Sequence, residues 1–284
     1  WKISLAVLQP VTPTVPENRF LAGMSRAAAN RSDAAMTASS STPKLPVSVC
    51  IIAGNEASRI RRALESVAGW AGEIIVLLNH DVNDGTDKIA ESFGAKVFRE
   101  PWKGYAAQKN SAAQKAGQEW VLSLDADEEI SSTLQNEIFA IFAIGNLDSS
   151  IAAWSFPRCS FYGGRWIRHG DWYPDRKIRL WRRGHAEWRG QNVHETLVVN
   201  GKVGKLKGDL LHYTMETLND HLRKSVLYSD LFAQQERGRG KNAGAFMLWF
   251  RPWWRFVRGY FLRLGFLDGW QGYAIARMVA LETF

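Results

Sequence analysis

The sequence lacks the features that mark several protein classes. It contains only two cysteines, Cys50 and Cys159, which lie far apart and form no Cys-x-x-Cys or Cys/His spacing. This scarcity excludes a disulfide framework and a zinc site of ordinary spacing, and it predicts two buried thiols, with Cys50 in a strand. No apolar run reaches the roughly 18 residues of a membrane-spanning helix, and the start does not resemble a secretion signal. The sequence opens on Trp1 rather than Met, which is typical of a fragment.

Two motifs for binding nucleotide phosphates are also missing. No Gly-x-Gly-x-x-Gly follows any of the early apolar runs, and no P-loop is present. The first absence argues against a dehydrogenase, and the second removes the P-loop enzymes.

The chain is nevertheless rich in apolar, basic and indole-bearing residues. Its 284 residues are 46% apolar, which supplies ample core for one large domain. Lys and Arg number 36 against 28 acidic residues, for a formal charge of +8 and a pI near 9.6, which indicates polyanionic partners such as phosphates, anionic lipid or nucleic acid. Thirteen Trp are present, a residue favoured in ligand clefts and at membrane interfaces.

The pattern along the chain predicts an α/β fold after a leader. Residues 1–44 are largely small, polar and aperiodic, which is typical of a disordered segment. From Pro46 on, the strand-like runs "VSVCII", "EIIVLL", "AKVF" and "WVLSL" alternate with segments of helical spacing, and a further helix is expected from Ser131 to about Ile144. Such alternation predicts a mainly parallel sheet with helices on both faces. The aromatic and Arg-rich stretch that follows predicts hairpins and long loops laid over the sheet edge.

Four carboxylates stand where the last of these strands should end. They are Asp125, Asp127, Glu128 and Glu129, in "LDADEEI". Ligands of parallel sheets gather at the carboxyl ends of strands. Asp125 and Asp127 are two residues apart, so in extended backbone both carboxylates project the same way and can share Mg²⁺ or Mn²⁺, which would neutralise a departing pyrophosphate. The alternative is an ordinary solvated charge cluster.

The motifs together resemble a known enzyme family. "VSVCIIAGNEASRIRRALESV", "NDGTDKIAE" and "GYAAQKNSAAQKAGQEWVLSLDADEEI", in this order, resemble the nucleotide-sugar half of glycosyltransferase family 2, which has the Rossmann-like GT-A fold. "WYPDRKIRLWRR", "VHE" and "GFLDGWQGY" resemble the bacterial lipopolysaccharide core β-glucosyltransferase group. The resemblance implies a GT-A domain over 45–215 and a C-terminal helical, membrane-associating segment over 216–284.

The resemblance also implies a donor site. The residues that would border the nucleotide or its phosphates are Ala53, Asn55, Glu56, Asn79, Asp84, Lys109, Asn110 and Asp125. Asp125 would contact ribose or metal, and Asp127 would be the principal metal ligand. The family commonly has Asp where this chain has Asn79, and an uncharged amide leaves the choice of nucleotide open.

Several of these positions have an ordinary alternative. Asp84 could be a turn residue before a helix capped at Thr86, and Lys109 could be a solvated surface charge. Glu128 could contact sugar hydroxyls or simply place negative charge at the start of the following helix.

Inverting sugar transfer needs a carboxylate that takes the acceptor proton. Glu195, in "GQNVHETL", matches the group's "VHE" and is the expected base; the alternative is an exposed glutamate at a strand start. His194 would orient substrate or be structural, and Arg176 and Arg179 would bind phosphate, lock a loop or form surface ion pairs. Sugar-stacking candidates, some of which must instead pack the sheet edge, are Trp166, Trp172, Trp181 and Trp188.

The C-terminal segment combines aromatic residues with Arg251, Arg255 and Arg258 on one helical face. This composition is typical of a helix lying in a membrane interface, although a core-packing helix is the alternative. Pro252 predicts that a helix starts or kinks there.

These observations favour an inverting glycosyltransferase. The resemblance implies UDP-glucose as donor, a lipid-linked saccharide such as lipopolysaccharide inner core as acceptor, and no nucleic-acid partner. It also implies a cytoplasmic location, peripheral on the inner face of the cytoplasmic membrane. The alternatives are a nucleotidyltransferase acting on a sugar phosphate, which could also use paired carboxylates, and a non-catalytic membrane- or polyanion-binding module.

Overall fold

The computed structural model describes residues 44–143, 148, 150–190, 195–215 and 245–283, all within the unit Thr42–Phe284. The leader expected over 1–44, apart from Lys44, lies outside these ranges. The sequence pattern also predicts a helix from Leu218 to about Arg237, and this segment lies outside them too. The strands are β1 Leu45–Ala53, β2 Ala71–Asn79, β3 Lys96–Glu100, β4 Trp120–Asp125, β5 Glu128–Ile130, β6 Ile151–Tyr162, β7 Arg165–Trp166, β8 Asp175–Arg182, β9 Ala186–Arg189, β10 Thr196–Val199, β11 Lys202–Lys205 and β12 Leu210–Met215. The helices are α1 Ile60–Ala68, α2 Thr86–Ser92, α3 Tyr105–Gln114, α4 Ser132–Ala143, α6 Ala245–Val257 and α7 Gly269–Leu281, with short turns η1 Gly170–Trp172, η2 Arg258–Leu262 and η3 Gly265–Asp268.

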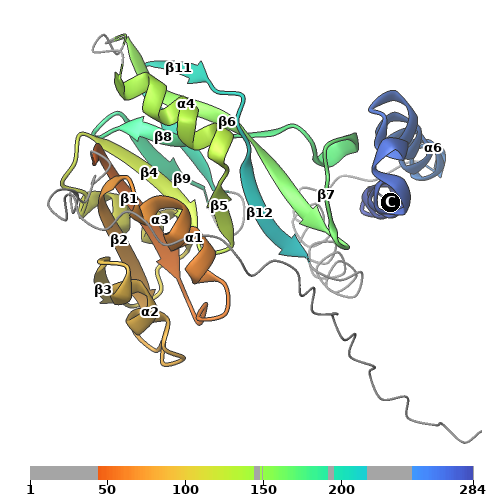
Figure 1. Ribbon diagram of the computed structural model, residues 1–284. Coiled ribbons are helices and arrows are strands. Elements are labelled where there is room, and N and C mark those ends of the chain that lie inside the picture. The colour runs from red at the N-terminus through yellow and green to blue at the C-terminus, as the bar shows by residue number, and fades with distance from the viewer. Residues whose placement is uncertain (1–43, 144–147, 149, 191–194, 216–244, 284) are drawn as a thin grey trace, which may run out of the picture. The chain divides into compact units, whose positions relative to one another are not determined.

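A ten-stranded sheet organises the described chain (Figure 1). Its order is β3-β2-β1-β4-β8-β6-β12-β5, with β7 and β11 pairing with β6. Strands β1 to β4 are parallel, and β8 runs antiparallel between β4 and β6. The expected α/β fold with a mainly parallel sheet is therefore confirmed.

Helices cover both faces of the sheet because the strands are apolar on both sides. On one face, α1, α2 and α4 pack on the alternate residues Val47, Val49 and Ile51 of β1 and their neighbours. On the other face, α3 packs with Cys50, Ile75 and Val121. This confirms the two-faced cover predicted from the continuous apolar runs.

The segment after α4 differs from the expectation of hairpins laid over the sheet edge. Strands β6, β8 and β12 extend the sheet itself, since β8 pairs with the edge of β4 that would otherwise expose unpaired backbone groups. Among the described residues, β9 and β10 form the one separate two-stranded hairpin, which packs on the same face as α3.

Both cysteines are free and buried, as expected, in β1 and β6. Burial raises the pKa of the Cys50 thiol well above its usual range and that of Cys159 to about 11. Both thiols are therefore unreactive packing residues.

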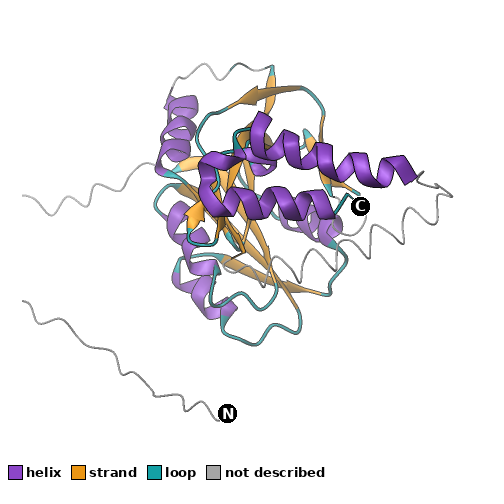
Figure 2. Cartoon of the chain, turned by 90° about the vertical axis from the view of Figure 1, so that its right-hand side faces the viewer, coloured by secondary structure: helices purple, strands orange, loops and turns teal. Residues whose placement is uncertain are grey.

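The C-terminal helices α6 and α7 lie alongside each other (Figure 2). Helix α6 begins at Ala245, so Pro252 lies inside it rather than at its start. Arg255 Nε lies 3.2 Å from the buried carboxylate of Asp171, so the expected arginine face turns partly toward the η1 loop. Within the described ranges, no helix has both the length and the apolarity needed to cross a bilayer.

Candidate functional site

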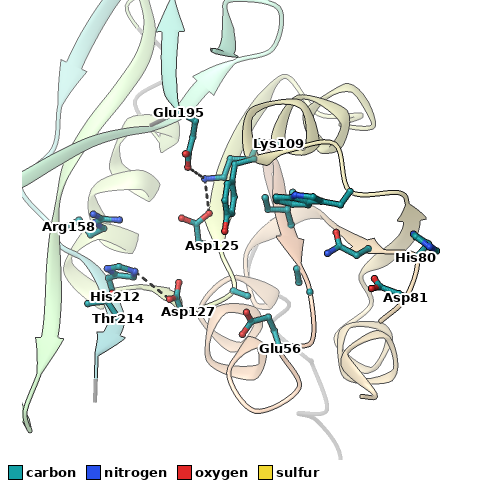
Figure 3. A pocket seen from close by; sticks show the side chains of 17 residues that line it. Glu56, His80, Asp81, Lys109, Asp125, Asp127, Arg158, Glu195, His212 and Thr214 are labelled. Carbon is teal, nitrogen blue, oxygen red and sulfur yellow. Dashed lines mark hydrogen bonds and ion pairs between the residues drawn. The ribbon is translucent and has the colours of Figure 1, made fainter. Parts of the chain in front are cut away.

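A cleft of about 930 Å³ opens at the carboxyl ends of the parallel strands (Figure 3). Its lining includes most of the residues expected at the donor site and the expected base: Ala53, Glu56, Asn79, Lys109, Asp125, Asp127 and Glu195. Asn55 and Asp84 are exposed and are not among the described residues that line it.

The parallel register brings these side chains together. Ala53, Asn79 and Asp125 are the last residues of β1, β2 and β4, and these strands are neighbours in the sheet. Ile52 of β1 lies opposite Asp125 of β4. Because parallel strands end at the same edge, groups far apart in sequence converge there.

Asp125 is held between two cations. One carboxylate oxygen lies 3.0 Å from Lys109 Nζ, and the other accepts a hydrogen bond from Arg179 Nη2 at 2.6 Å. Burial alone would raise the pKa of Asp125, but the charges of Arg179 and Lys109 hold it well below its usual range. The group is therefore a carboxylate with each oxygen engaged by one cation, and its role as a metal ligand stays a prediction.

Glu128 and Arg179 form the buried layer behind Asp125. Glu128 is fully buried in β5, where its carboxylate accepts hydrogen bonds from the Asp125 backbone N–H at 3.0 Å and from Arg179 at 2.8 Å. Neither residue is among the described residues that line the cleft, and Arg179 forms a buried ion pair with Glu128 rather than a surface one. Burial alone would lower the pKa of Arg179, but Asp125 and Glu128 raise it, so its charge is fixed.

Lys109 connects the two sides of the site. Its ammonium lies 3.0 Å from Glu195 Oε1 as well as 3.0 Å from Asp125, and 4.6 Å from the centre of the Trp188 ring. The side chain is only 4% exposed, so it is not the solvated surface charge that is usual for a helix lysine. Figure 3 shows the Lys109 ammonium between the two carboxylates, with Glu195 on one side and Asp125 on the other.

Asp127 faces His212 across the floor of the cleft (Figure 3). His212 Nε2 lies 3.5 Å from Asp127 Oδ2, and the two residues come from different parts of the chain, the β4–β5 turn and β12. Burial alone would raise the pKa of Asp127, but the hydrogen bond and charge of His212 bring it below its usual value. Burial and the charge of Asp127 raise the pKa of Glu56 despite the nearby Arg59.

These residues fit a Mg²⁺ or Mn²⁺ ion that is shared with a substrate. Among the described residues, no group of three or more His, Cys, Asp or Glu side chains lies together as a complete metal cage. Asp127 and His212 offer one carboxylate and one imidazole, and ions of this kind are commonly held by one or two protein groups together with substrate phosphates. Asp127 and His212 would therefore hold the ion.

Other expected residues have structural roles here. Asp84 accepts hydrogen bonds from Ala57 N–H at 2.9 Å and from the Thr86 hydroxyl at 2.6 Å, so it joins the loop after β1 to the start of α2. Arg176 donates to the carbonyls of Ser155 and Leu206 at 2.8 and 2.7 Å. His194 lies outside the described residues.

Asn110 and the four expected tryptophans are not among the described residues that line the cleft. Asn110 bonds to the backbone of Trp188. The described residues lining the cleft include none of Trp166, Trp172, Trp181 or Trp188.

The sequence reasoning missed several residues that line the cleft. They are His80, Asp81, Trp102, Tyr105, Arg158, His212 and Thr214. His212 carried a usable signal, because a histidine inside the apolar strand sequence "LLHYTM" calls for a partner. Trp102 lies two residues after the end of β3, where its place near a strand end could have been noticed.

Comparison with known proteins identifies the relatives of this chain. The profile described as glycosyl transferase family 2 matches residues 48–196. An uncharacterised glycosyltransferase of Rickettsia typhi is 33% identical over 247 residues, 84% of each chain. The lipopolysaccharide core biosynthesis glycosyltransferase LpsC of Rhizobium meliloti is 30% identical over 256 residues, 85% of this chain and 93% of its own. Among solved structures, the mannosyltransferase PcManGT from Pyrobaculum calidifontis, in complex with GDP-Man and Mn²⁺, gives a TM-score of 0.48 at 14% identity over 84% of this chain and 86% of its own.

Proposed function

The chain belongs to glycosyl transferase family 2 and is a nucleotide-sugar glycosyltransferase, and we propose that it transfers glucose with inversion to a lipid-linked saccharide. The observation that supports the mechanism is the arrangement of two pairs of residues in one cleft (Figure 3). Asp127 and His212 form the first pair, and Lys109 and Glu195 form the second. Their separation supports a leaving diphosphate near Asp127 and His212 and an attacking hydroxyl near Glu195.

On the donor side, the strand ends would bind the nucleotide. Ala53 and Asn79 line the cleft at the ends of β1 and β2, and the Asn79 amide can donate and accept hydrogen bonds with a base edge. A divalent cation bound by Asp127 and His212 would neutralise the charge that develops on the departing nucleoside diphosphate. Asp125, fixed by Arg179 and Lys109, would orient the ribose.

On the acceptor side, Glu195 would act as the general base. Direct displacement at the anomeric carbon requires the acceptor hydroxyl to lose its proton as the new bond forms. Glu195 Oε1 is held by Lys109 at 3.0 Å, which fixes the carboxylate toward the cleft. One displacement inverts the anomeric centre, so no covalent intermediate is needed.

The acceptor is proposed from a relative and from the surface. The matched Rhizobium meliloti protein bears the name of a lipopolysaccharide core biosynthesis enzyme, which supports a lipopolysaccharide inner core as acceptor. The C-terminal segment exposes large aromatic residues, with Trp249 79% and Phe246 74% exposed. Such a surface, on a chain of net charge +8, supports peripheral contact with an anionic membrane on the cytoplasmic side.

The test is the release of nucleoside diphosphate from a panel of UDP-, GDP- and ADP-sugars, with Mn²⁺ or Mg²⁺ and with a chelator. We expect UDP-glucose to be used and the chelator to stop release. Asp127→Ala should lower release by at least about 100-fold, because preorganised charge stabilisation of this kind contributes on that order. Glu195→Gln should lower transfer by about 100- to 10,000-fold while donor binding remains.

Asp87→Ala is the matched control, since Asp87 is an aspartate paired with Arg99 outside the cleft lining. A non-catalytic binding module would show equal values for all variants. Use of a GDP- or ADP-sugar alone would overturn the donor assignment.

A further inference from the structure

The side chain of Asn110 imitates a peptide group of a neighbouring strand. Its Nδ2 donates to the Trp188 carbonyl at 2.8 Å, and its Oδ1 accepts from the Trp188 N–H at 2.9 Å. Two hydrogen bonds between one amide and one residue's backbone fix both distance and orientation. Helix α3 is thereby fastened to strand β9.

Trp188 passes this restraint to the segment that carries Glu195. In the β9–β10 hairpin, Trp188 lies opposite Leu197 and Arg189 lies opposite Thr196. Glu195 immediately precedes Thr196, the first residue of β10. Trp188, the residue that Asn110 anchors, is therefore paired with Leu197, which lies two residues after Glu195.

The surroundings of Trp188 make this anchor rigid. Trp188 is 6% exposed, and the centre of its ring lies 6.4 Å from the centre of the Trp181 ring and 4.6 Å from the Lys109 ammonium. Lys109, the residue before Asn110 in α3, binds the Glu195 carboxylate directly. Two consecutive residues of α3 therefore contact the two sides of this region: Asn110 binds the backbone of Trp188 in β9, and Lys109 binds the carboxylate of Glu195 before β10.

We propose that Asn110 is a positioning residue for Glu195, acting through the backbone of Trp188. This inference rests on the proposed role of Glu195 as general base. Asn110 itself lies outside the cleft lining, so it acts without touching the substrate. A displacement of about 1 Å in a reacting group can cost about 100-fold in rate, so loss of the amide pair should slow proton removal.

The experiment compares Asn110→Asp and Asn110→Ala with the parent in the transfer assay. Asn110→Asp keeps the size and the acceptor oxygen but replaces the donor Nδ2 with an oxygen that faces the Trp188 carbonyl. We expect kcat of transfer to fall by about 10- to 100-fold in both variants, with donor KM within about threefold of the parent, since uniform donor binding is untouched. Asn200→Ala is the control, because Asn200 is an exposed asparagine just after β10 and should keep the parent kcat.

A double variant separates positioning from simple stability. If Asn110 acts through the base, Asn110→Ala added to Glu195→Gln should lower kcat no further than Glu195→Gln alone, because groups that act as a unit are not additive. Multiplying effects, a parallel rise in donor KM, an unchanged kcat, or variants that fail to fold would each overturn the proposal. Full transfer by Glu195→Gln would instead show that the proposed base is wrong, which is a different result.

Discussion

Arg179 illustrates, at the scale of single residues, how the site depends on a buried charge. The residue is 4% exposed, and its Nη2 serves both Asp125 and Glu128. Its Nε and Nη1 have no hydrogen-bond partner among the described residues. The desolvation cost of this arrangement is substantial, so we infer that it serves the orientation of Asp125 more than stability.

Replacing Arg179 should therefore be costly. In Arg179→Met, Asp125 loses one of its two cations, and the one remaining cationic partner of Glu128 among the described residues is Arg158, 3.8 Å away. We expect the free energy of unfolding to fall by about 3–5 kcal/mol, as when one partner of a buried ion pair is removed. Urea denaturation measures this value. Arg189→Met, at an exposed ion pair, should change it by less than about 1 kcal/mol; equal losses in the two variants would show that burial of Arg179 is not the cause.

The residues of the site were only partly predictable from the sequence. Asp125 and Asp127 stand where an apolar run ends, so the pattern placed them at a strand end, whereas Lys109 was expected at the site only from the family resemblance. His212 could not be placed in the same way, because its approach to Asp127 depends on β12 pairing with both β6 and β5. Such long-range pairing leaves no spacing rule in the sequence.

At the scale of elements, one carboxylate fastens helix α3 to the loop before it. Glu100, the last residue of β3, accepts hydrogen bonds from Lys103 at 2.7 Å and Ser111 at 2.6 Å, and lies 2.7 Å from Lys115. These groups lower the pKa of Glu100 from 4.5 to about 2. Since α3 also carries Lys109 and Asn110, Glu100 supports the same helix that holds the proposed base.

The lowered pKa gives a stability prediction with a definite sign. A depressed carboxyl pKa stabilises the fold above the unfolded value of 4.5, and this contribution is lost as the pH falls toward about 2. Glu100→Gln should therefore be less stable than the parent at neutral pH, by at most about 1 kcal/mol because the group is solvent-screened. The difference should shrink between pH 4.5 and 2.

Thermal unfolding of the parent and Glu100→Gln across this range provides the measurement. Glu91→Gln, at an exposed position of α2, is the control and should follow the parent. A gap between parent and Glu100→Gln that stays constant with pH would contradict the assignment.

The elements themselves were largely predictable in the first half of the chain. Ile60, Leu64 and Val67 recur at helical spacing, and all three are buried on α1. The apolar runs of β1, β2 and β4 are buried on both faces. In the second half, β6 and β8 join the sheet by antiparallel pairing, and a mixture of Arg and aromatic residues does not reveal whether a strand lies over a sheet or within it.

At the scale of the whole described unit, two buried carboxylates fasten the C-terminal helices to the sheet domain. Asp268 is 1% exposed and accepts hydrogen bonds from the backbone N–H groups of Arg168 and His169 at 3.1 and 2.8 Å. Asp171 lies 3.2 Å from Arg255 Nε and 3.1 Å from Arg263 Nη1. A surface carried by these helices is therefore held in a fixed relation to the β6–β8 region, which contributes Arg158 to the cleft.

That surface is the basis of the membrane proposal. Its exposed aromatic and apolar residues include Phe246, Trp249, Trp253, Leu262, Trp270 and Leu281, each more than half exposed. Exposed apolar groups on this scale mark interaction sites. Arg251 and Arg277 are exposed on the same helices, which favours an anionic lipid surface over a neutral one.

Vesicle binding tests the proposal at this scale. The full chain should float with vesicles containing phosphatidylglycerol more strongly than with pure phosphatidylcholine vesicles, and added salt should reduce the difference. The double variant Trp249→Ser/Trp253→Ser should bind at least about tenfold more weakly, since about 1.4 kcal/mol is a factor of ten and two buried indoles exceed it. Phe98→Ser, at an exposed aromatic residue of β3, should bind like the parent. Equal vesicle binding by all three proteins, or no binding by the parent, would contradict the proposal that this aromatic surface binds the membrane.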